Sequence, residues 1–261
     1  MTEFRTRREP PQFRSVEVAR LAPVSPYLVR ITLTGPDLVG FELGKPAASV
    51  RLLLPPTGTN EVVVPAWNGN EFLFDDGERP VIRTLTPLRF DPATLELDVK
   101  IVRHGHGPLS TWASAAQPGD RGAISGPGRG YEVDANAPSY LLAGDESALP
   151  AIGQLIPLLP APSQVLVLVE IGSPDARIDL APHPQLRAQW HELPAGARGG
   201  DALVAAVLAA DLDPEVRVWA AGEAAAVQKI RKYLFDERGL ARSRVVVRGY
   251  WKHGRGGDSD S

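Results

Sequence analysis

The stretch Ser139–Pro150 reads SYLLAGDESALP and decides the fold of the second half of the chain. Its first part, Tyr140–Ala143, is a short apolar run of the kind that forms a buried strand in a parallel sheet. The run ends at Gly144-Asp145-Glu146-Ser147 and leads into a predicted helix that extends to about Leu159. A strand that turns through glycine into a helix is the first unit of a doubly wound sheet, and ligands bind at such turns.

The same alternation continues toward the C-terminus. The pattern predicts strands at 165–171, 186–193, 215–221 and 243–250, and helices at 200–211 and 222–238. Strand–helix alternation with short connections predicts βαβ units and a Rossmann-like parallel sheet. We therefore expect an α/β domain of the NAD(P)-binding type over residues 139–254, and a disordered tail over 255–261.

Upstream of this region the rhythm is different. Alternating strands are predicted at 14–21, 27–34, 49–54, 81–89 and 94–104, each bounded by Gly, Pro, Asp or Asn, and one helix is predicted at 108–116. Short strands separated by turns predict an antiparallel Greek-key β-barrel over residues 14–134. The chain is therefore expected to have two domains, joined by a linker at 134–138.

The composition excludes several classes of protein. The 261 residues include no cysteine, which excludes disulfides, thiolate metal sites and cysteine nucleophiles. A net charge of −3 disfavours binding to duplex nucleic acid. The N-terminus lacks the pattern of a signal peptide, and no apolar run approaches the roughly 20 residues that span a bilayer. We therefore expect a cytoplasmic protein without stable membrane insertion.

One candidate motif, Arg83-Thr84-Leu85-Thr86, lies on a predicted barrel strand. An arginine can bind a diphosphate there, and a hydroxyl can reach a flavin ring nitrogen. The alternation predicts Thr84 and Thr86 on one face of the strand, with Arg83 and Leu85 on the other. An ordinary amphipathic strand with a solvated arginine is the simpler interpretation.

A second candidate motif, HGHGPLSTW, covers His104–Trp112. Two glycines turn the chain into a helix with Pro108 near its first position, and the free N–H groups of a helix start bind phosphate. An ordinary capped helix fits the same pattern. Two histidines at positions 104 and 106 suggest a metal, but no nearby carboxylate completes a metal site, so none is predicted.

Two further segments belong to the α/β region. The turn at Gly144–Ser147 is not a G-x-G-x-x-G fingerprint, and its acidic pair suits ribose hydroxyls or a site between the domains better than a diphosphate. Gly249-Tyr250-Trp251-Lys252 ends the last strand, where two aromatic rings and a cation can cover a planar ring or an anion. A helix cap and a hydrophobic C-terminal contact are the structural alternatives.

Taken together, these segments resemble the siderophore-interacting proteins, a family of FAD-dependent ferric-siderophore reductases in the ferredoxin–NADP reductase-like superfamily. Arg83–Thr86 is similar to the family's Arg-x-Tyr-Thr flavin motif, and Ala143–Ile152 is similar to its Gly-Asp-Glu-Thr-Ala-Leu-Pro-Ala-Ile segment. His104–Ala113, Ala221–Glu223 and Gly249–Lys252 match three further motifs, in order. The resemblance covers roughly residues 14–254.

Two positions depart from related patterns. The tyrosine of the flavin motif is Leu85 here, which is expected to loosen or re-tune FAD binding. Ala221-Gly222 stands where ferredoxin–NADP reductases carry Cys-Gly near the nicotinamide. The resemblance therefore leaves two electron donors open, namely NAD(P)H and reduced ferredoxin.

The resemblance implies flavin-mediated electron transfer to a ferric siderophore, with no catalytic side chain. FAD contacts are expected along two barrel strands, at a helix start and at the edge of the α/β sheet: Arg83, Thr84, Leu85, Thr86, Lys100, Ile101, Val102, His104, Gly107, Pro108, Leu109, Ser110, Thr111, Asp145, Ser147 and Trp251. A cationic substrate pocket is expected from Arg51, Arg129 and Lys252. The alternatives are a general flavin or ferredoxin–NADP-type reductase without siderophore preference, and a non-catalytic siderophore-binding flavoprotein module.

Overall fold

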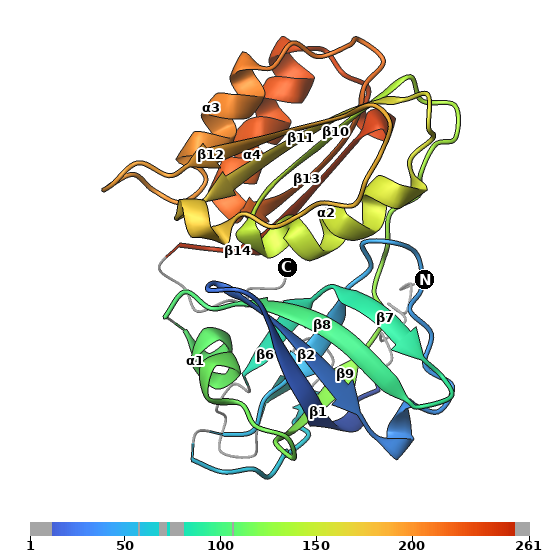
Figure 1. Cartoon of the computed structure of the whole chain (residues 1–261), viewed down its shortest axis with the longest axis vertical. Coiled ribbons are helices and arrows are strands. Elements are labelled where there is room, and N and C mark those ends of the chain that lie inside the picture. The colour runs from blue at the N-terminus through green and yellow to red at the C-terminus, as the bar shows by residue number, and fades with distance from the viewer. Residues whose placement is uncertain (1–11, 57, 68–71, 74–80, 106, 254–261) are drawn as a thin grey trace, which may run out of the picture.

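The computed structural model describes residues 12–56, 58–67, 72–73, 81–105 and 107–253 (Figure 1). The expected tail at 255–261 and the histidine at position 106 lie outside these residues. In the described part of the chain, no helix is long and apolar enough to span a membrane. Two stacked units are visible in Figure 1, an antiparallel sheet below and a parallel sheet flanked by helices above.

The first unit is a seven-stranded antiparallel sheet with the order β6-β3-β9-β1-β2-β8-β7. Its strands are β1 (Arg14–Ser25), β2 (Leu28–Thr34), β3 (Val50–Leu53), β6 (Ile82–Leu85), β7 (Pro87–Asp91), β8 (Glu96–Val102) and β9 (Arg121–Ser125). Helix α1 (Pro108–Ala115), a 3-10 turn at Pro36–Leu38 and a small β4–β5 hairpin (Ala66–Trp67 and Phe72–Leu73) accompany it. The pattern did not predict that hairpin.

The two edge strands of this sheet are neighbours in the sequence. β6 ends at Leu85 and β7 begins at Pro87, so only Thr86 separates strands at opposite edges of the sheet. One residue cannot bridge opposite edges of an open sheet. The sheet must therefore roll up until its edges meet, which confirms the predicted barrel and places Thr86 at its seam.

The seam also corrects one predicted strand. The pattern predicts a single strand over 81–89, but the structure divides it, with β6 paired to β3 and β7 paired to β8. Pro87 has no N–H group, so it could not donate a hydrogen bond to β3 if β6 continued, and its ring fixes φ. The chain therefore loses little hydrogen bonding when it leaves β3 and pairs with β8 at this position.

The second unit is the predicted parallel sheet, and its five strands have the order β12-β11-β10-β13-β14. Its strands are β10 (Ser139–Asp145), β11 (Gln164–Ile171), β12 (Leu186–Glu192), β13 (Arg217–Glu223) and β14 (Val245–Trp251). Helix α2 (Leu149–Leu155) lies between the sheet and the barrel, while α3 (Asp201–Ala209) and α4 (Ala224–Lys232) cover the other face (Figure 1). The fold is thus the expected β-barrel plus Rossmann-like sheet.

Two predicted helices are shorter than expected. The helix expected up to about Leu159 consists of α2 between two 3-10 turns, at Glu146–Ala148 and Ile156–Leu158, and Pro157 accounts for the second change because it cannot donate an α-helical hydrogen bond. The helix expected over 222–238 is α4 followed by a π-helical turn at Tyr233–Glu237.

The core explains the sequence pattern of the α/β unit. All seven residues of β10 are buried, as expected for a central parallel strand covered on both faces. One core cluster joins α2 to the sheet and also takes in Ala47 and Tyr131 from the first unit. The other cluster packs α3 and α4 on the opposite face. The α2 face is therefore the one that continues into the barrel.

Candidate flavin and substrate site

The flavin motif lies along β6 and ends at the barrel seam. Arg83 is half-buried, and its Nη1 donates to the Ile82 carbonyl at 2.7 Å. Thr84 is exposed and pairs in register with Arg51 on β3, so the two side chains share a face of the sheet. Leu85 points the other way and packs into the barrel core with 9% of its surface exposed.

Thr86 does not share the face of Thr84, contrary to the sequence-based expectation. It lies past the end of β6 and is only 5% exposed, because the chain changes partner strands there. Its side chain lies close enough to the phenol of Tyr250 on β14 to influence the pKa of that group. Burial raises the pKa of the Tyr250 phenol, and Thr86 opposes part of that rise. Thr86 therefore connects the barrel seam to the last strand of the α/β unit.

The β8 segment at 100–102 borders the seam. Lys100 and Val102 are half-buried, whereas Ile101 belongs to the barrel core. β7 pairs with β8 only as far as Val99, while β2 pairs with it up to Val102. The backbone of 100–102 thus extends past β7 on one side, which suits a flat ligand. Burial, together with nearby Arg30, lowers the pKa of Lys100.

The start of α1 fits a phosphate group. Gly107 precedes the helix with φ of 76°, and no side chain caps this end. Apart from its chain neighbours, a Cβ built on Gly105 or Gly107 would meet no atom of the described residues within 4 Å, so both glycines border open space. The Ser110 hydroxyl accepts the N–H groups of His104 and Gly105, at 2.9 and 3.1 Å, and fixes the turn. Uncapped N–H groups beside a glycine turn are suited to the diphosphate of FAD.

A second group of expected residues meets at the carboxyl edge of the parallel sheet. The buried Asp145 carboxylate accepts the Ser147 N–H at 2.9 Å, the Glu223 N–H at 3.1 Å and the Trp251 indole N–H at 2.7 Å. Burial raises the pKa of Asp145, although each of these hydrogen bonds opposes the rise. The structure thus brings Asp145, Ser147 and Trp251 together, and their polar groups bind one another.

Two further acids lie at the same edge: Glu170, which was not among the expected site residues, and Glu223, which belongs to the Ala221–Glu223 motif. Glu170, next to last in β11, accepts the Gly200 and Leu203 N–H groups at the start of α3, at 2.6 and 2.9 Å. Glu223 accepts the Ala226 N–H at the start of α4, at 2.8 Å. Burial raises the pKa of Glu170, with its hydrogen bonds opposing. In the sequence, Glu170 is a single acid near the end of an apolar strand, and this pattern could have marked it as a candidate.

This edge includes the place where an open α/β sheet binds ligands. The chain leaves β10 toward β11 and later returns to β13 on its other side, so the carboxyl ends of β10 and β13 are the topological switch point of the sheet. Gly222 lies beside it, because a Cβ there would come within 2.6 Å of an Asp145 carboxylate oxygen. A side chain at position 222 would therefore displace Asp145.

Two of the three expected substrate cations lie on neighbouring segments. Arg51 pairs with Ser125 at the end of β9, and the Gly128 N–H donates to Ser49 at 2.6 Å, which holds the segment of Arg129 beside β3. Arg51 is half-buried, and Arg129 and Lys252 are exposed. Lys252 follows Trp251 at the carboxyl edge, and the described contacts do not join it to either arginine.

The barrel, the parallel sheet and the uncapped helix start define a two-domain fold of the ferredoxin reductase-like class. Two family models match the chain: the siderophore-interacting FAD-binding domain at residues 17–131 and the siderophore-interacting protein model at residues 137–254. The chain belongs to the siderophore-interacting protein family.

Individual relatives agree with this assignment. A siderophore utilization protein from T. fusca has a structure that superposes with a TM-score of 0.82 at 34% identity, covering 95% of each chain. An uncharacterized protein of Mycobacterium tuberculosis is 32% identical, covering 92% of this chain and 90% of its own. The ferric vibriobactin reductase ViuB of Vibrio cholerae is 29% identical, covering 93% and 90%.

Proposed function

We propose that this chain is a cytoplasmic, FAD-dependent ferric-siderophore reductase with domains at 14–134 and 139–254. The observation that carries the proposal is the uncapped start of α1 beside two open glycines, next to a barrel seam that holds Thr86. The similarity to a ferric vibriobactin reductase over most of both chains supports it.

In this proposal Arg83 and the α1 start hold the FAD diphosphate. The segments at Thr84–Thr86 and 100–102 border the flavin ring, and Asp145, Ser147 and Trp251 lie at the α/β edge. When bound, FAD accepts two electrons together and passes them on singly, which suits an iron acceptor. The protein's own task is to bind the cofactor, leave a ring edge accessible and attract the chelate.

The substrate class follows from charge. Ferric siderophores hold iron through hard oxygen donors and are often anionic, and reduction to ferrous iron weakens that binding. Arg51, Arg129 and Lys252 are the cations we assign to attracting such a chelate, and this attraction weakens as salt is added.

The electron donor is NAD(P)H, which would bind at the switch point between the carboxyl ends of β10 and β13, or reduced ferredoxin, which would approach from outside. Anaerobic mixing of FAD-loaded protein with NADH, NADPH or reduced ferredoxin, followed by a ferric chelate, identifies the donor by flavin bleaching and recovery. A protein that takes up no FAD would contradict the proposal.

The substrate pocket has its own test. Arg51→Ala and Lys252→Ala are expected to slow ferric-chelate reduction more than they lower FAD content. Arg187→Ala, which removes an exposed arginine from edge strand β12, is the charge-matched control. If all three variants reduce the chelate equally well, the pocket assignment is wrong.

The same mixing experiment separates the alternatives. A general reductase would oxidise its donor with any acceptor and gain nothing from a ferric chelate. A non-catalytic module, which the replacement of the motif tyrosine by Leu85 favours, would bind the chelate without flavin. Thr86→Val is expected to change the flavin spectrum in the reductase, and an unchanged spectrum would remove Thr86 from the site.

A further inference from the structure

Gln154 on α2 links the α/β unit to two separate barrel segments. Its Nε2 donates to the Pro87 carbonyl at 2.7 Å and to the Leu88 carbonyl at 3.2 Å. Its Oε1 accepts the Ala47 N–H at 3.1 Å. One side-chain amide therefore uses its donor group and its acceptor on the barrel, a geometry that fixes the position of both segments.

Ala47 is held from a second side. Arg248 of β14 donates to the Ala47 carbonyl at 2.6 Å and to the Gly130 carbonyl at 2.9 Å. Ala47 is fully buried and has a φ of 51°, a left-handed conformation that a non-glycine residue seldom adopts. Both polar backbone groups of this residue are bound by side chains of the opposite unit, so its conformation is maintained by the contact between the units.

The segment that Gln154 binds is the barrel seam. Pro87 and Leu88 directly follow Thr86, and consecutive Cα atoms lie only about 3.8 Å apart. The proline ring removes most of the freedom of the intervening backbone. Holding the Pro87 carbonyl therefore also limits movement of Thr86, the residue whose hydroxyl we assign to the flavin ring.

The same helix begins close to the carboxyl end of β10. α2 follows the 3-10 turn at Glu146–Ala148, which Asp145 caps, and its seven residues extend about 10 Å. Its first residues pack in the core while Gln154, near its end, binds the seam. A short rigid element thus connects the turn after Asp145 to the residue after Thr86.

We propose that Gln154 is a positioning residue for the flavin site, which holds the barrel seam against the α/β unit and so sets where Thr86 meets the flavin ring. This inference rests on the proposed binding of FAD. It assigns Gln154 no contact with the flavin or the chelate. Its effect reaches the cofactor through the Pro87 and Leu88 carbonyls.

The first test is Gln154→Met, which keeps the length of the side chain and removes its hydrogen bonds. We expect FAD to bind about fivefold more weakly and its visible absorbance bands to shift. Ser163→Ala is the matched control, because it removes a buried hydrogen bond from the Ser163 hydroxyl to the Ala137 carbonyl, at 2.7 Å, in the linker rather than at the seam. The control is expected to bind FAD with the wild-type spectrum.

The second test follows a reversible change within one variant and uses the wild type as its reference. In Gln154→Glu a carboxylate faces the Pro87 and Leu88 carbonyls at high pH, whereas the protonated acid can donate to them. Because these carbonyls and partial burial raise the pKa of the new carboxyl, we expect the flavin bands to shift reversibly between roughly pH 5 and 8. The wild-type spectrum, measured alongside, gives the reference.

Flavin spectra of Gln154→Glu that match the wild type at every pH would overturn the inference, as would a Ser163→Ala shift as large as that of Gln154→Met. Failure of the wild-type protein to take up FAD would instead overturn the proposed function. If FAD binds and the spectra shift but no ferric chelate is reduced, the role of Gln154 stands and the reductase assignment fails.

Discussion

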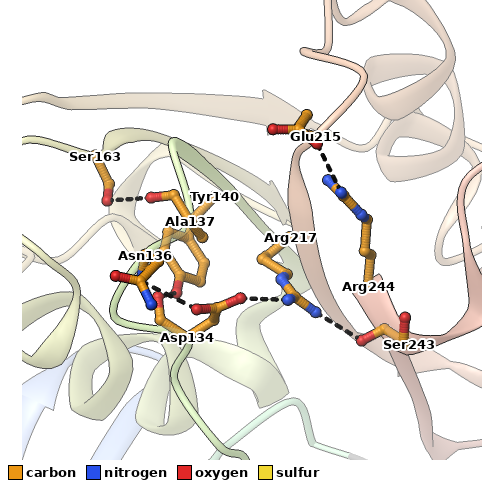
Figure 2. Close-up of polar contacts among 9 residues, drawn as sticks. All are labelled: Asp134, Asn136, Ala137, Tyr140, Ser163, Glu215, Arg217, Ser243 and Arg244. Atoms are coloured by element: carbon orange, nitrogen blue, oxygen red, sulfur yellow. Dashed lines mark hydrogen bonds and ion pairs between the residues drawn. The ribbon is translucent and has the colours of Figure 1, made fainter.

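The two edges of the parallel sheet hold their acidic side chains in opposite ways. At the carboxyl edge, Asp145 and Glu170 are buried and accept hydrogen bonds from backbone N–H groups, and in the case of Asp145 also from an indole. At the amino edge, Asp134 forms an ion pair with Arg217 at a partly exposed position, and Glu215 pairs with Arg244 at 2.8 Å (Figure 2). Backbone dipoles stabilise one edge and arginines the other.

The amino edge also anchors the linker between the units. Figure 2 shows Asp134, Asn136 and Ala137 gathered beside Tyr140 and Arg217. The Tyr140 hydroxyl donates to the Asp134 carbonyl, and Arg217 donates to the Ser243 carbonyl at 2.9 Å. The exposed amino edge thus fixes the joint between the units, while the buried carboxyl edge includes the switch point where a ligand is proposed to bind.

Because the acids of the two edges have different partners, we expect their contributions to stability to change in opposite directions with pH. Burial raises the pKa values of Asp145 and Glu170, so their contribution to stability is present at low pH and is lost as the pH rises through the folded-state values. The Asn136 N–H and then Arg217 lower the pKa of Asp134, so its contribution is present above the ordinary value of 3.8 and is lost as the pH falls.

The largest effect is expected from Glu170→Ala. It leaves the Gly200 and Leu203 N–H groups without their acceptor in a buried place, and we expect the free energy of unfolding in urea to fall by about 3 kcal/mol. Glu192→Ala removes an exposed acid that ends neighbouring strand β12 and pairs with Arg177, and it is expected to cost under about 1 kcal/mol. Equal losses would show that burial does not distinguish these acids.

Trp251→Phe should have an intermediate effect. It removes the indole donor to Asp145 and keeps an aromatic ring, so we expect a loss of about 1.5 kcal/mol and a further rise in the pKa of Asp145. Carboxyl NMR titration measures the second quantity. Trp190→Phe, which alters a half-buried tryptophan packed against the core cluster of α2, is the control, and a similar Asp145 titration in both variants would contradict the role of the indole.

The smallest effect at neutral pH is expected from Asp134→Asn, because the ion pair that it breaks is partly exposed. Its signature is the pH dependence: the variant should lose less stability than the wild type when the pH is lowered from 6 to about 3. Glu170→Gln should instead reduce the loss of stability that the wild type shows as the pH rises above the ordinary pKa of a glutamate. Urea unfolding of both variants and the wild type at several pH values measures this dependence. If the stability of both variants follows that of the wild type at every pH, the two edges do not differ in their response to pH.

The sequence predicted the elements better than their contacts. Alternation along 27–34 and the apolar run at 165–171 were sufficient to identify a barrel strand and a buried parallel strand, since burial on one or two faces dictates those patterns. The division at Thr86 was not predictable, because Thr86 and Pro87 are both compatible with a continuing edge strand. Only the closure of the barrel requires the chain to change partners there.

Part of the expected site lies together in the structure, while its contacts with FAD stay a prediction. Asp145, Ser147 and Trp251 are bonded to one another, because the carboxyl ends of β10 and β14 lie at one edge of the sheet. Gln154 and Arg248 were missed, since a glutamine in a short helix and an arginine in a strand look like solvated residues. Their partners lie in the other unit, and contact between units leaves no periodic mark in a sequence.

The one-residue seam at Thr86 constrains how this chain can vary. An extra residue between Leu85 and Pro87 would shift the pleat of one edge strand relative to the other and turn its inward side chains outward. Loops elsewhere can grow by insertion at little cost, but this junction has a fixed length. Natural variation here should therefore consist of substitutions alone, and a glycine inserted after Thr86 should abolish flavin uptake before it unfolds the α/β unit.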